Sequence, residues 1–134
     1  MIKAYRMQDM ARAVGFDWDK KEDVWNKVKE EIAELEVEMN TMVALQKSTE
    51  ATQQQKDEAV SRAQCELGDL FFSLVNAARL YKLEPDTALE STNSKFRNRF
   101  TYLEQETIRK GRSLKEMTLE EMDAIWNEAK AKGL

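Results

Sequence analysis

The sequence contains no histidine, one cysteine, one proline and four glycines in 134 residues. Without histidine there is no imidazole general base, no Ser/His or Cys/His nucleophile arrangement and no His-ligated zinc. The single cysteine, Cys65, cannot form an internal disulfide, and the first residues lack the pattern of a signal peptide. We therefore expect a cytoplasmic protein whose chemistry depends on carboxylates, lysine, arginine, tyrosine or a metal.

Long apolar runs and an excess of positive charge are also missing. The longest nearly apolar run, residues 70–78, is about half the length that crosses a bilayer, which argues against a membrane span. A formal net charge of −4 argues against a nucleic acid polymer as partner. With 42% apolar and 34% charged residues and few turn formers, the composition favours long helices. We predict an all-α fold in a single domain covering residues 1–134.

Apolar periodicity and helix-punctuating residues predict five helices. The expected spans run from Ile2 to about Val14, from Lys20 to Lys47, from about Lys56 to Tyr81, from Pro85 to near Gly111 and from Leu119 to about Lys130. Asp19 and Glu22 have the capping-box spacing at the start of the second span. Thr118 and Glu121 have it at the start of the fifth. Residues 48–59, polar and rich in glutamine, predict either a loop or an exposed helical extension.

The second and third of these helices are expected to build the core. In the second, the apolar residues expected on the core side are Val24, Val28, Leu35, Met39 and Met42. In the third, apolar residues cover a wide face that includes Leu67, Leu70, Phe71, Leu74, Val75 and Ala78. We therefore expect the third helix to lie at the centre of the fold.

Each of these two helices also carries a pair of acidic residues three positions apart, so that both acids project from one side of the helix. The pairs are Glu31 with Glu34 and Glu66 with Asp69. Like charges at this spacing repel, and a cation between the pairs would reverse the sign of that energy. Carboxylate oxygens suit Mg²⁺ or Mn²⁺ rather than zinc or copper. The two pairs are candidate halves of one metal site.

A solvated acidic face is the alternative interpretation of both segments. Five glutamates lie within residues 27–38, and Lys27 has the i,i+4 spacing of an ordinary ion pair with Glu31. Arg62 has the same spacing to Glu66. Glu66 and Asp69 are harder to assign to a solvated face, because they lie beside Leu67, Leu70 and Phe71 on the helix that is expected to be most buried.

The segment TNSKFRNRF, residues 92–100, interleaves cations with aromatic residues. On a helix Lys95 and Arg99 share one face. Phe96 and Phe100 share the adjacent face. By itself this pattern is typical of an amphipathic helix with an aromatic core side and a cationic outer edge. Beside an acidic metal site, the two cations would instead fit a substrate that carries phosphates.

These segments together resemble a known family. EEIAE, ELGD and NSKFRNRF, residues 30–34, 66–69 and 93–100, resemble the EExxE, ExxD and NxKFxxRF signatures of MazG nucleoside triphosphate pyrophosphohydrolases. GFDW (15–18) and LEEMDAIWNEAK (119–130) are similar to the C-terminal half of two-repeat MazG proteins. The resemblance spans nearly the whole chain in the family's order, and it predicts that the chain is the C-terminal part of a longer protein.

The resemblance implies a helical bundle of four to five helices that assembles as a homodimer or larger oligomer and binds Mg²⁺, with Mn²⁺ as a substitute. The implied reaction is hydrolysis of a nucleoside triphosphate to the monophosphate and pyrophosphate, with water attacking the α-phosphorus. By position, the implied metal ligands are Glu31, Glu34, Glu66 and Asp69, and the implied catalytic proton acceptor is Glu30 or Glu34. The implied phosphate-binding residues are Lys95, Arg99 and Asn93, and the implied nucleotide-binding residues are Lys27, Trp126 and Lys130.

Three alternatives stay open. Trp126, on the apolar face of the last helix, has the pattern of a core residue as well as that of a side chain that stacks on a base. A non-catalytic helical module for dimerisation or regulation would carry the same acids as a solvated face. A pyrophosphohydrolase restricted to one nucleotide, such as dUTP, would carry the same motifs. A P-loop ATPase is not supported, because the sequence has no GxxxxGK[ST] loop.

Overall fold

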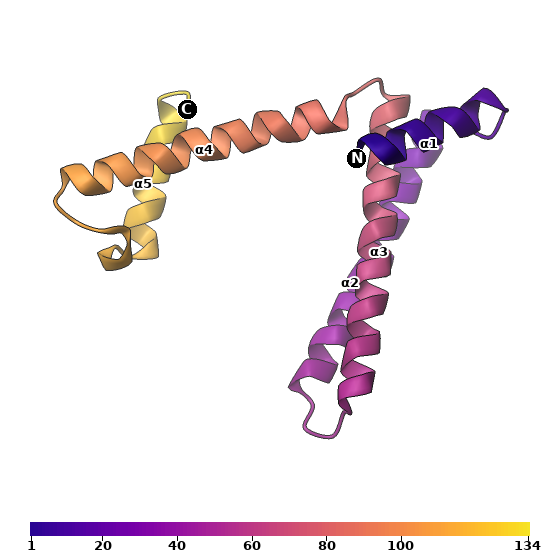
Figure 1. Ribbon diagram of the computed structural model, residues 1–134, viewed down its shortest axis with the longest axis horizontal. Helices are drawn as coiled ribbons and strands as arrows, with labels where there is room; N and C mark the ends of the chain where they lie inside the picture. Colours follow the sequence, from indigo (N-terminus) through magenta and orange to yellow (C-terminus); the bar gives the residue numbers. More distant parts are fainter. The chain divides into compact units, whose positions relative to one another are not determined.

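The computed structural model describes residues 1–134 and contains helices and loops without strands (Figure 1). Its elements are α1 (Ile2–Ala13), α2 (Lys21–Lys47), α3 (Gln53–Leu80), α4 (Pro85–Arg109), the short 3-10 helix η1 (Leu114–Glu116) and α5 (Leu119–Ala131). The predicted all-α class with five α-helices is confirmed. Backbone contacts divide the chain into two compact units, residues 1–86 and residues 87–134. None of the helices combines the length and the apolarity needed to cross a membrane.

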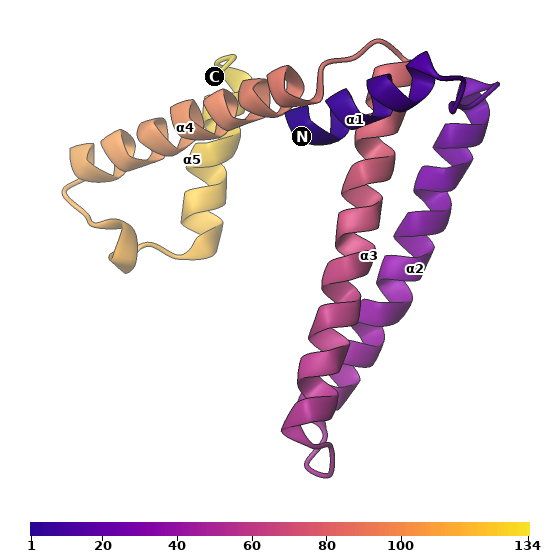
Figure 2. The same ribbon diagram turned by 45° about the vertical axis from the view of Figure 1, so that its right-hand side comes forward.

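In the first unit, α2 and α3 form an antiparallel hairpin closed by the loop of residues 48–52 (Figures 1 and 2). The contacts, taken from the loop outward, join Glu38 to Arg62, Glu31 to Glu66, and Val24 to Ala77. Positions that advance along α3 therefore retreat along α2. This pairing brings acidic residues that are far apart in sequence into one place.

The side chains between the two helices recur at alternating intervals of four and three residues, and we call these positions the seam. On α2 they are Val24, Val28, Glu31, Leu35, Glu38, Met42 and Leu45, and on α3 they are Ala59, Ala63, Glu66, Leu70, Ser73, Ala77 and Leu80. All of them are buried or half-buried. This spacing keeps one side of each helix against its partner, as in a coiled coil. Glu31 and Glu66 thus occupy positions that normally hold apolar side chains.

A second row of large apolar residues lies beside the seam and faces solvent. Its members each follow a seam position directly: Trp25, Ile32 and Met39 on α2, Leu67 and Leu74 on α3, and Tyr81 at the C-cap of α3. We call this row the apolar stripe. The prediction that Met39 packs inside the hairpin is therefore wrong, because it lies one position past the seam residue Glu38. α3 is central to the first unit, as expected, since it packs on both α1 and α2, but its apolar face is wider than these contacts cover.

α1 ends in a turn that returns the chain toward α3. Gly15 has a φ of 88°, a conformation that glycine adopts without steric cost, and its N–H donates to the Arg12 carbonyl. The N–H of Phe16 donates to the Ala11 carbonyl, which completes a Schellman cap. Gly15 therefore lies directly after the C-cap residue Val14. The segment that follows it, residues 16–20, crosses to the start of α2.

The two hairpin helices begin differently. α2 has Lys20 as its N-cap and no side-chain cap hydrogen bond, so the prediction that Asp19 and Glu22 form a capping box is wrong. The helix begins one residue later than expected, which places Asp19 outside the cap position. α3 begins with a complete capping box between Thr52 and Gln55. The polar stretch 48–59 is therefore a loop followed by an extension of α3.

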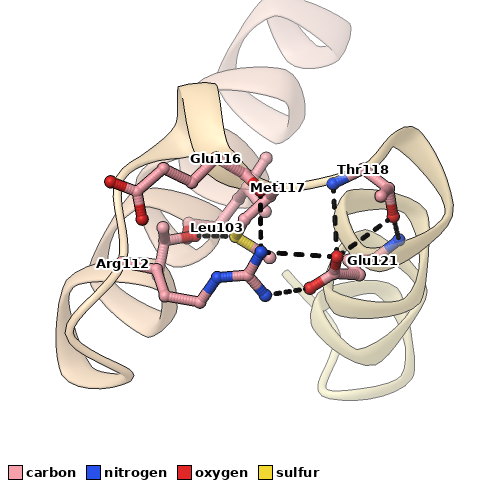
Figure 3. A network of polar contacts seen from close by, with 7 residues as sticks. Leu103, Arg112, Glu116, Met117, Thr118 and Glu121 are labelled. Carbon is pink, nitrogen blue, oxygen red and sulfur yellow. Dashed lines mark hydrogen bonds and ion pairs between the residues drawn. The ribbon is translucent and has the colours of Figure 1, made fainter.

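The second unit is held by an apolar cluster and a polar network. The buried cluster consists of Leu103 of α4, Met117 at the end of η1 and Ile125 of α5. Arg112 bonds the Glu121 carboxylate and the Glu116 carbonyl (Figure 3). The Thr118 side chain accepts the Glu121 N–H while the Glu121 carboxylate accepts the Thr118 N–H, which confirms the predicted capping box of α5.

Candidate metal centre

Three acidic side chains converge in the middle of the hairpin. Glu31 and Glu34 lie one turn apart on α2, and Glu66 faces them from α3. One carboxylate oxygen from each lies within 4.8 Å of the others. The antiparallel seam produces this arrangement, because it fixes the register that sets Glu31 against Glu66. The structure thus brings together three of the four acids predicted as metal ligands.

Two of these carboxylates are removed from water without full compensation. Glu31 is 5% exposed, and its Oε1 accepts a hydrogen bond from the Lys27 ammonium at 2.8 Å. Its Oε2 is buried and has no hydrogen-bond partner, and the same holds for Oε2 of the half-buried Glu66. Unpaired buried carboxylate oxygens are costly and rare in folded proteins. A ligand that neutralises them would remove that cost.

The charge distribution around the cluster also favours a cation. Desolvation raises the pKa of the Glu34 carboxyl, and the carboxylates of Glu31, Glu66 and Glu30 raise it further. The hydrogen bond to Glu31 raises the pKa of Lys27, whose ammonium is the cation closest to the cluster. Acid groups that repel one another in this way hold their protons more tightly until a cation joins them.

The donor set fits a hard divalent cation. All three side chains offer oxygen ligands and none offers sulfur or nitrogen, which matches the preference of Mg²⁺ or Mn²⁺. The two buried, unpartnered oxygens supply an observation independent of the count of acids. The residues present therefore fit such an ion.

The other acidic residues predicted for the site lie outside this cluster. Asp69, one turn past Glu66, is exposed and is not among the three converging acids. Glu30 is also exposed, with its Oε1 3.4 Å from the Lys27 ammonium. Arg62 pairs with Glu38 at 3.3 Å and not with Glu66, so the alternative that an Arg62 ion pair accounts for Glu66 is wrong. The predicted Lys27–Glu31 pair is confirmed.

The predicted residues of the second unit have different surroundings. Lys95 is exposed, whereas Arg99 donates from Nε to the carbonyl of Leu134 at 2.7 Å. Asn93 lines a recess of about 400 Å³ together with Phe96 and Arg97. Neither of the cations predicted to bind phosphate lines this recess. Arg97, which the sequence analysis did not single out, does.

Three of the four aromatic residues of the second unit lie close together. Phe96 stacks on Phe100 at a ring-centre distance of 6.0 Å, which agrees with their predicted common face. Trp126 is half-buried and lies 5.3 Å from Phe96, while Lys130 on the same helix is exposed. Phe96 is 59% exposed, and Trp126 is not part of the buried cluster of Leu103, Met117 and Ile125, so this contact does not decide between the two interpretations of Trp126.

An ion pair that the sequence analysis missed fixes the segment between α1 and α2. Arg79, near the end of α3, is buried and donates from Nη2 to Asp17 at 2.6 Å and to Asn76 at 2.7 Å. Asp17 and Arg79 are 62 positions apart, so no local pattern joins them. A charged residue ending an otherwise apolar helical run was the available signal.

We expect Asp17→Asn to lower stability by about 2 kcal/mol near neutral pH, because it weakens hydrogen bonds to a buried guanidinium. The Arg79 hydrogen bond lowers the pKa of Asp17 below its ordinary value of 3.8, so the stabilisation is present above that value and is lost as the pH falls below it. Thermal unfolding at pH 7 and pH 3 should show the difference between the two proteins shrinking in acid. An equal difference at both pH values would contradict this role.

Sequence comparison places the chain among known proteins. It is 35% identical over 127 residues to the Thermotoga maritima nucleoside triphosphate pyrophosphohydrolase/pyrophosphatase MazG, covering 95% of this chain and 42% of that protein. It is 32% identical over 130 residues to the nucleoside triphosphate pyrophosphohydrolase of Escherichia coli K12, and this alignment covers 97% of this chain and 44% of that protein. It is 55% identical over 65 residues to Bacillus subtilis YabN, and this alignment covers 48% of this chain and 13% of that protein.

The chain spans less than half the length of each of these relatives. No family profile matches it. The two long alignments nevertheless extend across all five helices at more than 30% identity. Nearly the whole chain is therefore homologous to nucleoside triphosphate pyrophosphohydrolases of the MazG family.

Proposed function

We propose that the chain hydrolyses a nucleoside triphosphate to the monophosphate and pyrophosphate in a reaction that depends on Mg²⁺. The observation that carries this proposal is the convergence of Glu31, Glu34 and Glu66, two of which bury an oxygen without a partner. Homology to pyrophosphohydrolases supplies the reaction class. In this proposal, residues 1–134 act as one catalytic domain.

In the proposed reaction, a water oxygen bonds to the α-phosphorus while the bond from that phosphorus to the α–β bridging oxygen breaks. Mg²⁺ held by the three acids, with Asp69 as a fourth ligand, would neutralise phosphate charge and acidify the attacking water. Glu34 or the neighbouring Glu30 would accept the proton from that water. No covalent intermediate with the protein is needed.

Cationic residues are assigned to the leaving group. Lys95 and Arg99 would offset the negative charge that builds on pyrophosphate, with Asn93 binding a phosphate oxygen. Lys27, Trp126 and Lys130 are assigned to other parts of the nucleotide. These assignments come from the family motif, and single alanine substitutions of Lys95 and Arg99 test them separately from the metal ligands.

The direct test is product analysis with the eight ordinary ribo- and deoxyribonucleoside triphosphates, with Mg²⁺ and with a chelator. Monophosphate and pyrophosphate formed only with the metal would support the proposal and rank the bases. Diphosphate and orthophosphate would mean that a different bond breaks. No turnover of any of the eight would favour either an enzyme for a modified nucleotide or a non-catalytic module.

We also propose that the protein acts as a homodimer whose contact surface includes the apolar stripe. The members of the stripe are between 38% and 48% exposed, and they lie on both helices of the hairpin. Trp25, Leu74 and Tyr81 line a common recess of about 440 Å³, so the stripe residues of α2 and those that follow the seam of α3 lie on one side of the hairpin. A continuous apolar face of this kind is typical of an association surface.

We expect Met39→Glu combined with Leu74→Glu to convert the dimer to a monomer, because two buried carboxylates would be brought into the apolar contact. Light scattering coupled to size-exclusion chromatography measures the mass. Val14→Glu is the matched control, since Val14 is 83% exposed and lies outside the stripe. A double variant with the wild-type mass would contradict this surface.

A further inference from the structure

A recess of about 520 Å³ lies between α1, the segment that follows it and the hairpin. Its wall includes Gln8 of α1, Phe16 and Trp18 of the connecting segment, and Phe72 and Ser73 of α3. This volume is in the range of cavities that hold small organic ligands. All of its lining residues belong to the first unit.

Three of the lining residues are aromatic and accessible. Trp18 is 40% exposed, Phe72 is 45% exposed and Phe16 is 81% exposed. The Schellman cap at Gly15 and the Asp17–Arg79 ion pair hold Phe16 and Trp18 at the recess. Aromatic faces in such a position bind planar rings by stacking.

Two buried polar atoms of the wall have no partner. The Gln8 amide nitrogen donates to the carbonyl of Phe72 at 3.0 Å, which fixes the other end of the amide as an acceptor. That Oε1 atom is buried and unpartnered, as is Nε of Arg79. An acceptor and a donor are thus left unused in the same wall. The edge of a nucleobase carries N–H donors, which are the partners that the Gln8 acceptor lacks.

The recess shares one residue with the candidate metal centre. Lys27 lines it and also binds Glu31 at 2.8 Å, so one side chain connects the two. A nucleotide with its phosphates at the acids would therefore have its nucleoside directed at the aromatic wall.

We propose that this recess binds the nucleoside of the substrate, with the base stacked on Trp18 and Phe72 and with Gln8 as a specificity-determining residue that accepts an N–H of the base. The proposal rests on the proposed function, because it assigns the nucleotide's base to a place next to the metal centre. Asp17 and Arg79 act as positioning residues for the Trp18 segment.

The test is calorimetric titration of the full chain with AMP, GMP, CMP and UMP, and with inorganic pyrophosphate as a ligand without a base. Trp18→Ala and Phe72→Ala should each weaken binding of the preferred monophosphate about tenfold, because they remove a stacking surface. Phe71→Ala is the matched control, since Phe71 is the neighbouring residue, is similarly exposed and does not line the recess. Gln8→Met should reduce the differences among the four bases. Pyrophosphate binding should not change in any of these variants.

Equal affinity in the Phe72→Ala and Phe71→Ala variants would overturn the recess proposal, as would a wild-type protein that binds none of the four monophosphates. Circular dichroism checks that each variant is folded. If Trp18→Ala does not fold, the comparison of Phe72→Ala with Phe71→Ala still tests the recess proposal. Triphosphate turnover is measured on the same samples. If the protein hydrolyses triphosphates but the Phe72→Ala and Phe71→Ala variants bind monophosphates equally well, only the recess proposal is overturned. If Phe72→Ala weakens monophosphate binding but no triphosphate is hydrolysed, only the proposed hydrolysis is overturned.

Discussion

Replacing Glu66 by glutamine is expected to reduce Mg²⁺-dependent hydrolysis by about a thousandfold or more, because a bound metal contributes several kcal/mol of charge stabilisation at a phosphoryl centre. Glu66 is the only acid of the converging three that α3 supplies. Its loss leaves Glu31 and Glu34 on α2, and on α3 only the exposed Asp69 that we propose as a fourth ligand. Glutamine keeps the size of the side chain, so packing in the seam is preserved.

The same substitution should leave the metal-free protein folded and at least as stable as the wild type. It removes a charge whose Oε2 is buried without a partner, and it removes repulsion with Glu31 and Glu34. Steady-state turnover and thermal unfolding in chelator measure the two effects. Glu36→Gln is the matched control, because Glu36 is an exposed acid of α2 outside the cluster. A Glu66→Gln enzyme with wild-type turnover would exclude the assigned metal centre.

The hairpin was predictable because its information is local. Apolar spacing along residues 20–47 and 56–81 predicted both long helices, and the observed bounds differ by only a few residues. The convergence of the acids depended on more than spacing. The sequence placed Glu31 and Glu34 on one side of a helix, but only the antiparallel register decides which acid of α3 faces them. That register selects Glu66, a seam residue, and leaves the exposed Asp69 out of the cluster.

The features that escaped prediction depend on contacts between distant segments. Asp17 and Arg79 are 62 positions apart, and Gln8 reaches the carbonyl of Phe72 across 64 positions. No helical period relates such residues. The exposure of the apolar stripe was missed for a different reason: apolar periodicity shows that a face avoids water, but it does not show whether the chain itself or another molecule covers that face.

We expect Mg²⁺ to stabilise the wild-type protein against heat and to do so much less in the Glu66→Gln variant. A ligand that binds only the folded state stabilises it by RT ln(1 + [L]/Kd), which is about 2.7 kcal/mol at one hundred times Kd. For a chain of this length that free energy corresponds to a rise in Tm of about 10 °C. The ligand oxygens come from two helices, so unfolding the hairpin separates them and destroys the site.

Thermal unfolding with increasing Mg²⁺, and with chelator, measures this linkage without any need for turnover. Ca²⁺ and Mn²⁺ should also stabilise the wild type, since both prefer oxygen ligands. NaCl at matched ionic strength controls for general screening of the acidic cluster, which lowers repulsion without a bound ion. If NaCl at matched ionic strength raised Tm as much as Mg²⁺ did, or if Glu66→Gln kept the full Mg²⁺ response, the three acids would be a solvated cluster and not a metal centre.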